Sequence, residues 1–163
     1  MRQIKMKMIV IASLLGLSSC ATIMPDQVGV KRTFGRINND VKKPGIVGFN
    51  PFTTRVVRVP VRTMNLAITE NLPSKEGLTI RSESSILYRV RAGAVPQILQ
   101  ETGMEFEDML ILPVFRSAAS DVCSKYDAKD MHSAKRAEIE EEIKKRLVEV
   151  CELKGFIIES VLL

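Results

Sequence analysis

Residues 78–90 constrain the fold more than any other part of this sequence, because their side chains alternate over a long run. A two-residue period of this kind is typical of a β-strand. One face of the strand would carry Ile80, Ser82, Ser84, Ile86, Tyr88 and Val90, and the other Arg81, Glu83, Ser85, Leu87 and Arg89. We therefore expect a long strand in a sheet that is covered on one side only.

Shorter runs of apolar and β-branched residues predict three more strands, over residues 28–34, 54–59 and 156–163. A turn is expected at residues 38–40, where the sequence is Asn-Asn-Asp. Pro60 has no backbone N–H to donate, so it is expected at a strand end or a sheet edge.

The second half of the chain changes to a helical period. Pro96 and Gly103 bracket a short helix, and a second short helix is expected over residues 106–112. Pro113 would open a third helix. Its apolar stripe would consist of Phe115, Ala118, Ala119, Val122 and Tyr126.

A longer helix is predicted over residues 134–154, with Ser133 as its N-cap and Gly155 at its end. Its buried face would carry Ile139, Ile143, Leu147 and Cys151. Its outer face has three acid-before-base pairs at i,i+4, which are Glu140–Lys144, Glu141–Lys145 and Glu142–Arg146. Each such pair contributes about 0.2–0.5 kcal/mol, so we interpret this run as a solvated helix face rather than a binding patch.

Strands followed by helices and a closing strand predict an α+β fold. The expected order is an antiparallel sheet, then short helices, one long charged helix and a last strand. The length of 163 residues suits one domain.

The N-terminal segment has the features of an export signal. Arg2, Lys5 and Lys7 precede an apolar run over residues 8–17, which is long enough for a signal peptide and too short to span a bilayer. The segment closes with Leu17-Ser18-Ser19-Cys20, which resembles the bacterial lipobox. The sequence therefore predicts a lipoprotein signal peptide at residues 1–19. The alternative is an uncleaved anchor with a chance Cys.

In the lipobox motif, the Cys thiol receives a diacylglyceryl group and the new amine is acylated with a fatty acid such as palmitate. Two or more acyl chains give stable attachment, so acylated Cys20 would hold the mature protein to membrane lipid. We expect a tether at residues 20–26 and a location in the bacterial cell envelope, on the extracytoplasmic side. The sequence does not decide between inner and outer membrane.

Other classes of function have little support in the sequence. Removing Arg2, Lys5 and Lys7 from the formal net charge of +5 leaves +2, which gives no argument for nucleic-acid binding. His132 is the only His, so no paired-imidazole metal site is expected.

Catalytic readings are also disfavoured. A Cys123–His132 nucleophile and base pair would need a Cys beside an apolar helix stripe to meet a His in a polar turn. Cys123 and Cys151 are expected as buried free thiols, with a disulfide as the alternative. Gly45 and Gly48 do not form a phosphate loop. We therefore expect no enzymatic activity, no cofactor and no small-molecule substrate.

Several stretches occur in an informative order. They are Gln27-Val28-Gly29-Val30, the Pro-Gly segment at residues 43–52, the polar turn and strand at 74–90, the helix entry Ile-Leu-Pro-Val-Phe-Arg-Ser at 111–117, the segment at 125–139, and the last strand at 155–163. In this order and spacing they resemble the SPFH domain, also called the band 7 or prohibitin homology domain, of the stomatin, prohibitin and flotillin superfamily. The resemblance covers residues 27–163.

The resemblance implies a membrane-attached scaffold rather than a catalyst. Members of the family assemble laterally into large homo-oligomers, organise membrane patches and often restrain membrane-bound AAA proteases. Two departures from the family pattern are expected: a lipid on Cys20 in place of an N-terminal membrane helix, and a sequence that stops at Leu163, where the family continues into a coiled coil. Whether Leu163 is a natural end or a truncation stays open. Ring size and client stay open. The second hypothesis is a small monomeric envelope lipoprotein that acts as an adaptor for one partner.

Overall fold

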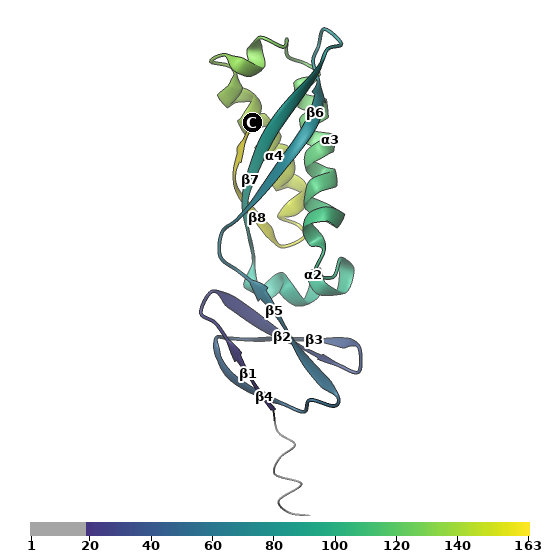
Figure 1. Cartoon of the computed structure of the whole chain (residues 1–163), viewed down its shortest axis with the longest axis vertical. Helices are drawn as coiled ribbons and strands as arrows, with labels where there is room; N and C mark the ends of the chain where they lie inside the picture. The colour runs from purple at the N-terminus through teal and green to yellow at the C-terminus, as the bar shows by residue number, and fades with distance from the viewer. Residues whose placement is uncertain (1–18) are drawn as a thin grey trace, which may run out of the picture. The chain divides into compact units, whose positions relative to one another are not determined.

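The computed structural model describes residues 19–163, so the predicted signal peptide lies outside the described residues apart from Ser19. The described chain forms two compact units, one ending at Pro60 and one running from Val61 to Leu163 (Figure 1). Antiparallel strands make up the first unit, and strands with helices make up the second. The predicted α+β class is confirmed, and the chain whose length suits one domain divides into two compact units.

The first unit contains two antiparallel sheets. Strand β1 (Ser19–Ile23) pairs with β4 (Gly45–Phe49), while β3 (Arg36–Lys42), β2 (Gln27–Thr33) and β5 (Thr54–Pro60) form a sheet in that order. A small core lies inside this unit, made of Ala21, Ile23, Val28, Val30 and Val59. The predicted strands around Val28 and over residues 54–59 are confirmed, and Pro60 ends β5 as expected.

The structure departs from the predicted tether at residues 20–26. Residues as far as Ile23 belong to β1, in which Ala21 and Ile23 are buried. Only the turn at Pro25 and Asp26 then leads into β2. Two buried side chains in so short a segment are too few to produce a recognisable alternation in the sequence. The strand is defined instead by its pairing with β4.

The turn expected at residues 38–40 is wrong, because these residues lie within β3, an edge strand exposed to solvent. Water can satisfy polar side chains there, so Asn and Asp are tolerated. The hairpin instead turns at Phe34 and Gly35, which have φ angles of 47° and 83°. Positive φ at both central residues is typical of a two-residue type I′ loop.

The second unit is built on a three-stranded antiparallel sheet. Strands β6 (Met64–Pro73), β7 (Thr79–Val90) and β8 (Phe156–Leu162) lie in that order. On β7, Ile86, Tyr88 and Val90 are buried while the residues between them point outward. The one-sided strand predicted from its alternation is therefore confirmed. Strand β6 was not anticipated from the sequence.

Helices α2 (Val95–Glu101), α3 (Leu112–Cys123) and α4 (Arg136–Cys151) follow β7. Figure 1 shows α3 and α4 side by side against one face of the sheet. The two predicted apolar stripes are buried, apart from Tyr126, which lies beyond the end of α3. Helix α4 begins at Arg136 rather than directly after Ser133, whose hydroxyl accepts a hydrogen bond from the Lys135 N–H at 3.3 Å in the preceding turn.

The separate short helix predicted over residues 106–112 is not formed. A wide π-helical turn at Glu107–Ile111 runs directly into α3. Pro113 supplies a physical reason, because in a regular α-helix its ring would clash with the carbonyl of Met109 four residues earlier. A wider turn moves that carbonyl aside and lets the helix continue.

Aromatic side chains connect the sheet to the helical layer. The ring of Phe156 on β8 lies 6.3 Å from that of Tyr88 and 5.4 Å from that of Phe106, measured between centroids. All three are buried. The Tyr88 hydroxyl donates a hydrogen bond to the Glu107 carboxylate. Burial, and then the Glu107 carboxylate, raise the pKa of Tyr88, so its hydroxyl remains a donor at neutral pH.

Gly155 joins α4 to β8 in a conformation that favours glycine. Its φ is 90°, and a Cβ at this position would lie 2.1 Å from the Cβ of Ala94. Its carbonyl accepts a hydrogen bond from the Arg91 N–H at 2.8 Å. The connection therefore packs directly against the segment that precedes α2.

We expect Gly155→Ala to lower the free energy of unfolding by about 3 kcal/mol or more, because a clash adds to the strain of an L-residue at positive φ. Gly77→Ala is a matched control, since Gly77 has a φ of 80° with open space around it. Adding Ala94→Gly should recover much of the difference. Urea unfolding followed by circular dichroism measures all three variants, and equal losses for Gly77→Ala and Gly155→Ala would contradict the steric explanation.

Candidate functional site

The predicted lipid-attachment residue Cys20 lies on β1 with its side chain exposed. Pairing places it opposite Gly48 on β4, and the Gly48 carbonyl accepts a hydrogen bond from Lys31 Nζ at 2.8 Å. Because side chains alternate along a strand, burial of Ala21 directs Cys20 outward. The thiol is therefore accessible on the outside of a folded strand.

Cys20 is itself part of a folded strand, and buried residues follow it at once. Ala21 is only 6% exposed and Ile23 only 2% exposed. A lipid on Cys20 would therefore be joined directly to the first unit, without flexible residues between the acyl chains and the fold.

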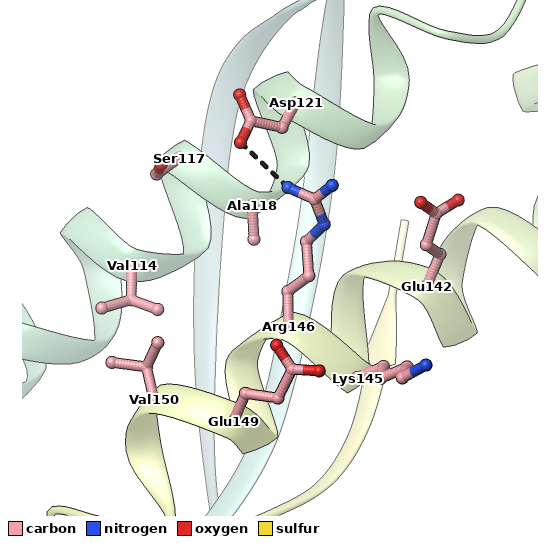
Figure 2. Close-up of a pocket in the computed structure, with 9 residues that line it drawn as sticks. All are labelled: Val114, Ser117, Ala118, Asp121, Glu142, Lys145, Arg146, Glu149 and Val150. Carbon is pink, nitrogen blue, oxygen red and sulfur yellow. Dashed lines mark hydrogen bonds and ion pairs between the residues drawn. The ribbon is translucent and has the colours of Figure 1, made fainter.

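A groove with a volume of about 600 Å³ lies between α3 and α4 in the second unit. Figure 2 shows Val114 and Val150 facing each other at one end, with Asp121 joined to Arg146 farther along. Its other lining residues are Ser117, Ala118, Glu142, Lys145 and Glu149. The groove therefore combines apolar side chains at one end with side chains of both charge signs along its length, and protein-contact surfaces likewise combine apolar and polar groups.

The charged side chains of α4 reach across to the α3 segment. Arg146 Nη1 lies 2.9 Å from Asp121 Oδ2, and Lys125 Nζ lies 2.7 Å from Glu142 Oε1. The hydrogen bond from Lys125 holds the pKa of Glu142 below its ordinary value, although burial acts in the opposite direction. A carboxylate kept charged in this way is poorly matched to general acid–base catalysis near neutral pH.

The self-contained ladder of i,i+4 pairs predicted on this helix is therefore wrong. Glu142 and Arg146 bond to α3 and the residues following it, and Glu140 pairs at 3.0 Å with Arg136, which precedes it. Glu141 lies 3.9 Å from Lys144. Exposed pairs of this kind are worth about 0.2–1 kcal/mol each. The pairs of Glu142 and Arg146 help to align α4 with the α3 segment, whereas those of Glu140 and Glu141 stay within α4.

Cys123 and His132 do not form a catalytic pair. Cys123 is fully buried on α3, whereas His132 is exposed and lines a separate hollow with Met131 and Arg136. Cys123 and Cys151 are both free and buried, as predicted, and burial raises the pKa of each thiol to about 11. Few thiolates exist at neutral pH under these conditions.

Within residues 19–163, no group of three or more His, Cys, Asp or Glu side chains is arranged to hold a metal ion. In the same described part of the chain, no helix combines the length and apolar character needed to cross a membrane.

The family model described as SPFH domain / Band 7 family matches residues 21–163, which include both units. The chain therefore belongs to the SPFH/band 7 family, a family of membrane-associated proteins with a general scaffolding role. The match confirms the resemblance carried by the order and spacing of the sequence stretches. A comparison with curated proteins finds no match.

Sequence reasoning missed the groove, because its two walls come from helices whose relative rotation is set only by packing. The sequence contained only a weak indication of the groove. Val114 and Val150 are apolar residues that fall outside the predicted buried stripes of their helices.

We expect Cys123 and Cys151 to react with the thiol reagent DTNB at pH 8 at least about tenfold more slowly in native protein than in denatured protein, since a pKa of about 11 leaves little thiolate. Released chromophore measures the rate. Unmodified Cys20 would add one fast-reacting thiol, which a lipidated chain lacks. Fast reaction of two thiols in a native Cys20→Ser protein would contradict the buried state of this pair.

Proposed function

We propose that this protein is a lipid-anchored SPFH scaffold of the bacterial envelope, attached through acylated Cys20 on the extracytoplasmic side of a membrane. Copies of the chain assemble laterally and organise or restrain membrane proteins, with membrane-bound AAA proteases as the expected partner class. The observation that carries the proposal is an exposed Cys on the first described strand, in a family of membrane-associated scaffolds.

Two features support the anchor. Leu17-Ser18-Ser19-Cys20 has the order of an aliphatic residue, two small residues and a Cys that the lipobox requires. Cys20 is exposed, while the other two thiols are buried. It is therefore the one Cys whose chemistry suits modification by an enzyme.

A scaffold works through protein contacts, and the α3–α4 groove offers a surface for them. It combines the apolar side chains of Val114 and Val150 with charged side chains that already pair with each other within the chain. We propose no catalytic role, because the Cys123 thiol is buried and the Glu142 carboxylate is held charged by Lys125. The same groove also favours the second candidate, a monomeric adaptor that binds one envelope partner.

Replacement of the anchor residue tests the attachment. We expect Cys20→Ala to yield a longer, unprocessed precursor that incorporates no labelled palmitate, because the thiol that accepts diacylglycerol is lost. Labelling of cells followed by gel analysis measures both effects. Cys123→Ala is the matched control and should be processed and labelled normally. Label retained in the Cys20→Ala variant would refute the assignment.

The native mass after gentle detergent extraction separates the scaffold from the adaptor. We expect a large and uniform assembly of the untagged protein, because lateral self-association is the basis of the scaffolding role. Native electrophoresis with mass spectrometry of companion proteins measures size and partners together. A monomer, or a single discrete heterodimer, would favour the adaptor instead.

A further inference from the structure

Two phenylalanines of the first unit are exposed and lie in neighbouring turns. Phe34, in the β2–β3 turn, and Phe52, in the loop between β4 and β5, are each 78% exposed. The N–H of Phe34 donates to the carbonyl of Thr53 at 3.0 Å, which joins the two turns. We call Phe34 and Phe52 the phenylalanine tip.

The phenylalanine tip lies at the same end of the first unit as Cys20. The loop that carries Phe52 continues directly from Phe49, which pairs with Ser19 at the start of β1. The next pair along these strands is Cys20 with Gly48. An acylated Cys20 would therefore bring this end of the unit to a bilayer surface.

Phe34 occupies a position that suits another residue type. Among the described residues it is the non-glycine residue with positive φ, at 47°. Asn, Asp or Gly normally fills the first place of such a two-residue hairpin turn, and a bulky side chain there is strained. Because the ring is 78% exposed, packing within the fold does not offset this strain. A strained residue with an exposed ring is consistent with an interaction outside the folded chain.

Cations surround the phenylalanine tip. Arg32 on β2 lies directly opposite Arg55 on β5, and Arg36 follows the turn. All three are exposed, and no ion pair in the described part of the chain includes them. Like charges placed opposite each other disfavour strand pairing. An anionic surface would remove that repulsion.

Positive charge is concentrated in the unit that carries Cys20. Residues 20–60 contain seven Lys and Arg against two Asp, a net charge of +5. Residues 61–163 contain fourteen Lys and Arg against seventeen Asp and Glu, a net charge of −3. Basic residues beside a membrane anchor are attracted to anionic lipid headgroups.

We propose that the phenylalanine tip, together with Arg32, Arg36 and Arg55, forms a second membrane contact that binds anionic lipid headgroups and inserts two phenyl rings at the interface. The proposal rests on the proposed Cys20 anchor only for delivering the unit to the membrane. Acyl chains hold the protein at the bilayer without fixing its orientation, whereas this second contact holds the same end of the first unit against the surface.

Single tryptophan reporters test the insertion, because the sequence contains no Trp. Phe34→Trp and Phe52→Trp report on the tip. Ile46→Trp, at the far end of β4 and 78% exposed, and Leu153→Trp, in the second unit and 83% exposed, are matched controls. The lipidated protein is placed in vesicles of phosphatidylcholine and phosphatidylglycerol in equal amounts, with brominated acyl chains as the quencher.

We expect brominated lipid to quench Phe34→Trp and Phe52→Trp at least about twofold more than the two controls, because only the tip reaches the acyl region. Quenching should fall in vesicles of phosphatidylcholine alone. It should also fall in an Arg32→Gln, Arg55→Gln variant, but not in the charge-matched Lys75→Gln, Arg81→Gln variant of the second unit. Equal quenching at all four positions, or no dependence on anionic lipid, would overturn the proposal.

Phe34→Asn separates membrane contact from folding, because it should move two readouts in opposite directions. Relief of the strained turn should raise Tm by roughly 4–8 °C. Loss of one ring should reduce quenching of the Phe52→Trp reporter. A stabilised variant with unchanged quenching would count against a role for Phe34 at the membrane.

Failure of the anchor and failure of this contact are distinguishable. Intact mass spectrometry shows whether Cys20 carries lipid. If it does not, cosedimentation of the same variants with the same vesicles still tests the contact directly. A lipidated protein whose Phe34→Trp and Phe52→Trp reporters are not quenched by brominated lipid refutes the contact alone. A co-purified acidic protein that shields these reporters from the lipid would identify a protein partner in place of lipid.

Discussion

The return of β8 to the sheet is the interaction on which the second unit depends. The chain leaves β7, passes through three helices and comes back to pair with β7 again, and this closure places α4 across the sheet. Gly155 makes the return possible, since its backbone turns with φ of 90° against Ala94. Phe156 then packs between Tyr88 and Phe106. The helical layer and the α3–α4 groove are consequences of that closure.

The first unit is organised differently, because its core is small and many of its side chains are exposed to solvent. Cys20 is exposed because its neighbours Ala21 and Ile23 on the same strand point into the core of the first unit. The same unit has a net positive charge, whereas residues 61–163 have a net negative charge, and it carries two exposed phenyl rings that do not pack in its core. The proposed lipid attachment and the proposed membrane contact therefore both fall in one unit, while the other unit has a groove suited to protein contacts.

Long periodic segments were predictable from the sequence, because many residues support the same interpretation. The alternation of β7 and the four-residue repeat of Ile139, Ile143, Leu147 and Cys151 both correspond to buried faces. Short segments were not predictable. Strand β1 buries only two side chains, and β3 places Asn and Asp on an exposed edge where the local preference for a turn is overridden by pairing. The partners of Glu142 and Arg146 lie on another helix, so no spacing within α4 could reveal them.

The sequence by itself determined the α+β class, the family, the main buried faces and Cys20 as the candidate lipid site, because each of these depends on local pattern or on motif order. Tertiary structure alone decided that Cys20 belongs to a strand, that Phe34 and Phe52 occupy neighbouring turns, and that α3 and α4 enclose a groove. The physical reason is that local periodicity reports which side of an element is buried. Only packing determines which elements meet and which exposed side chains they bring together.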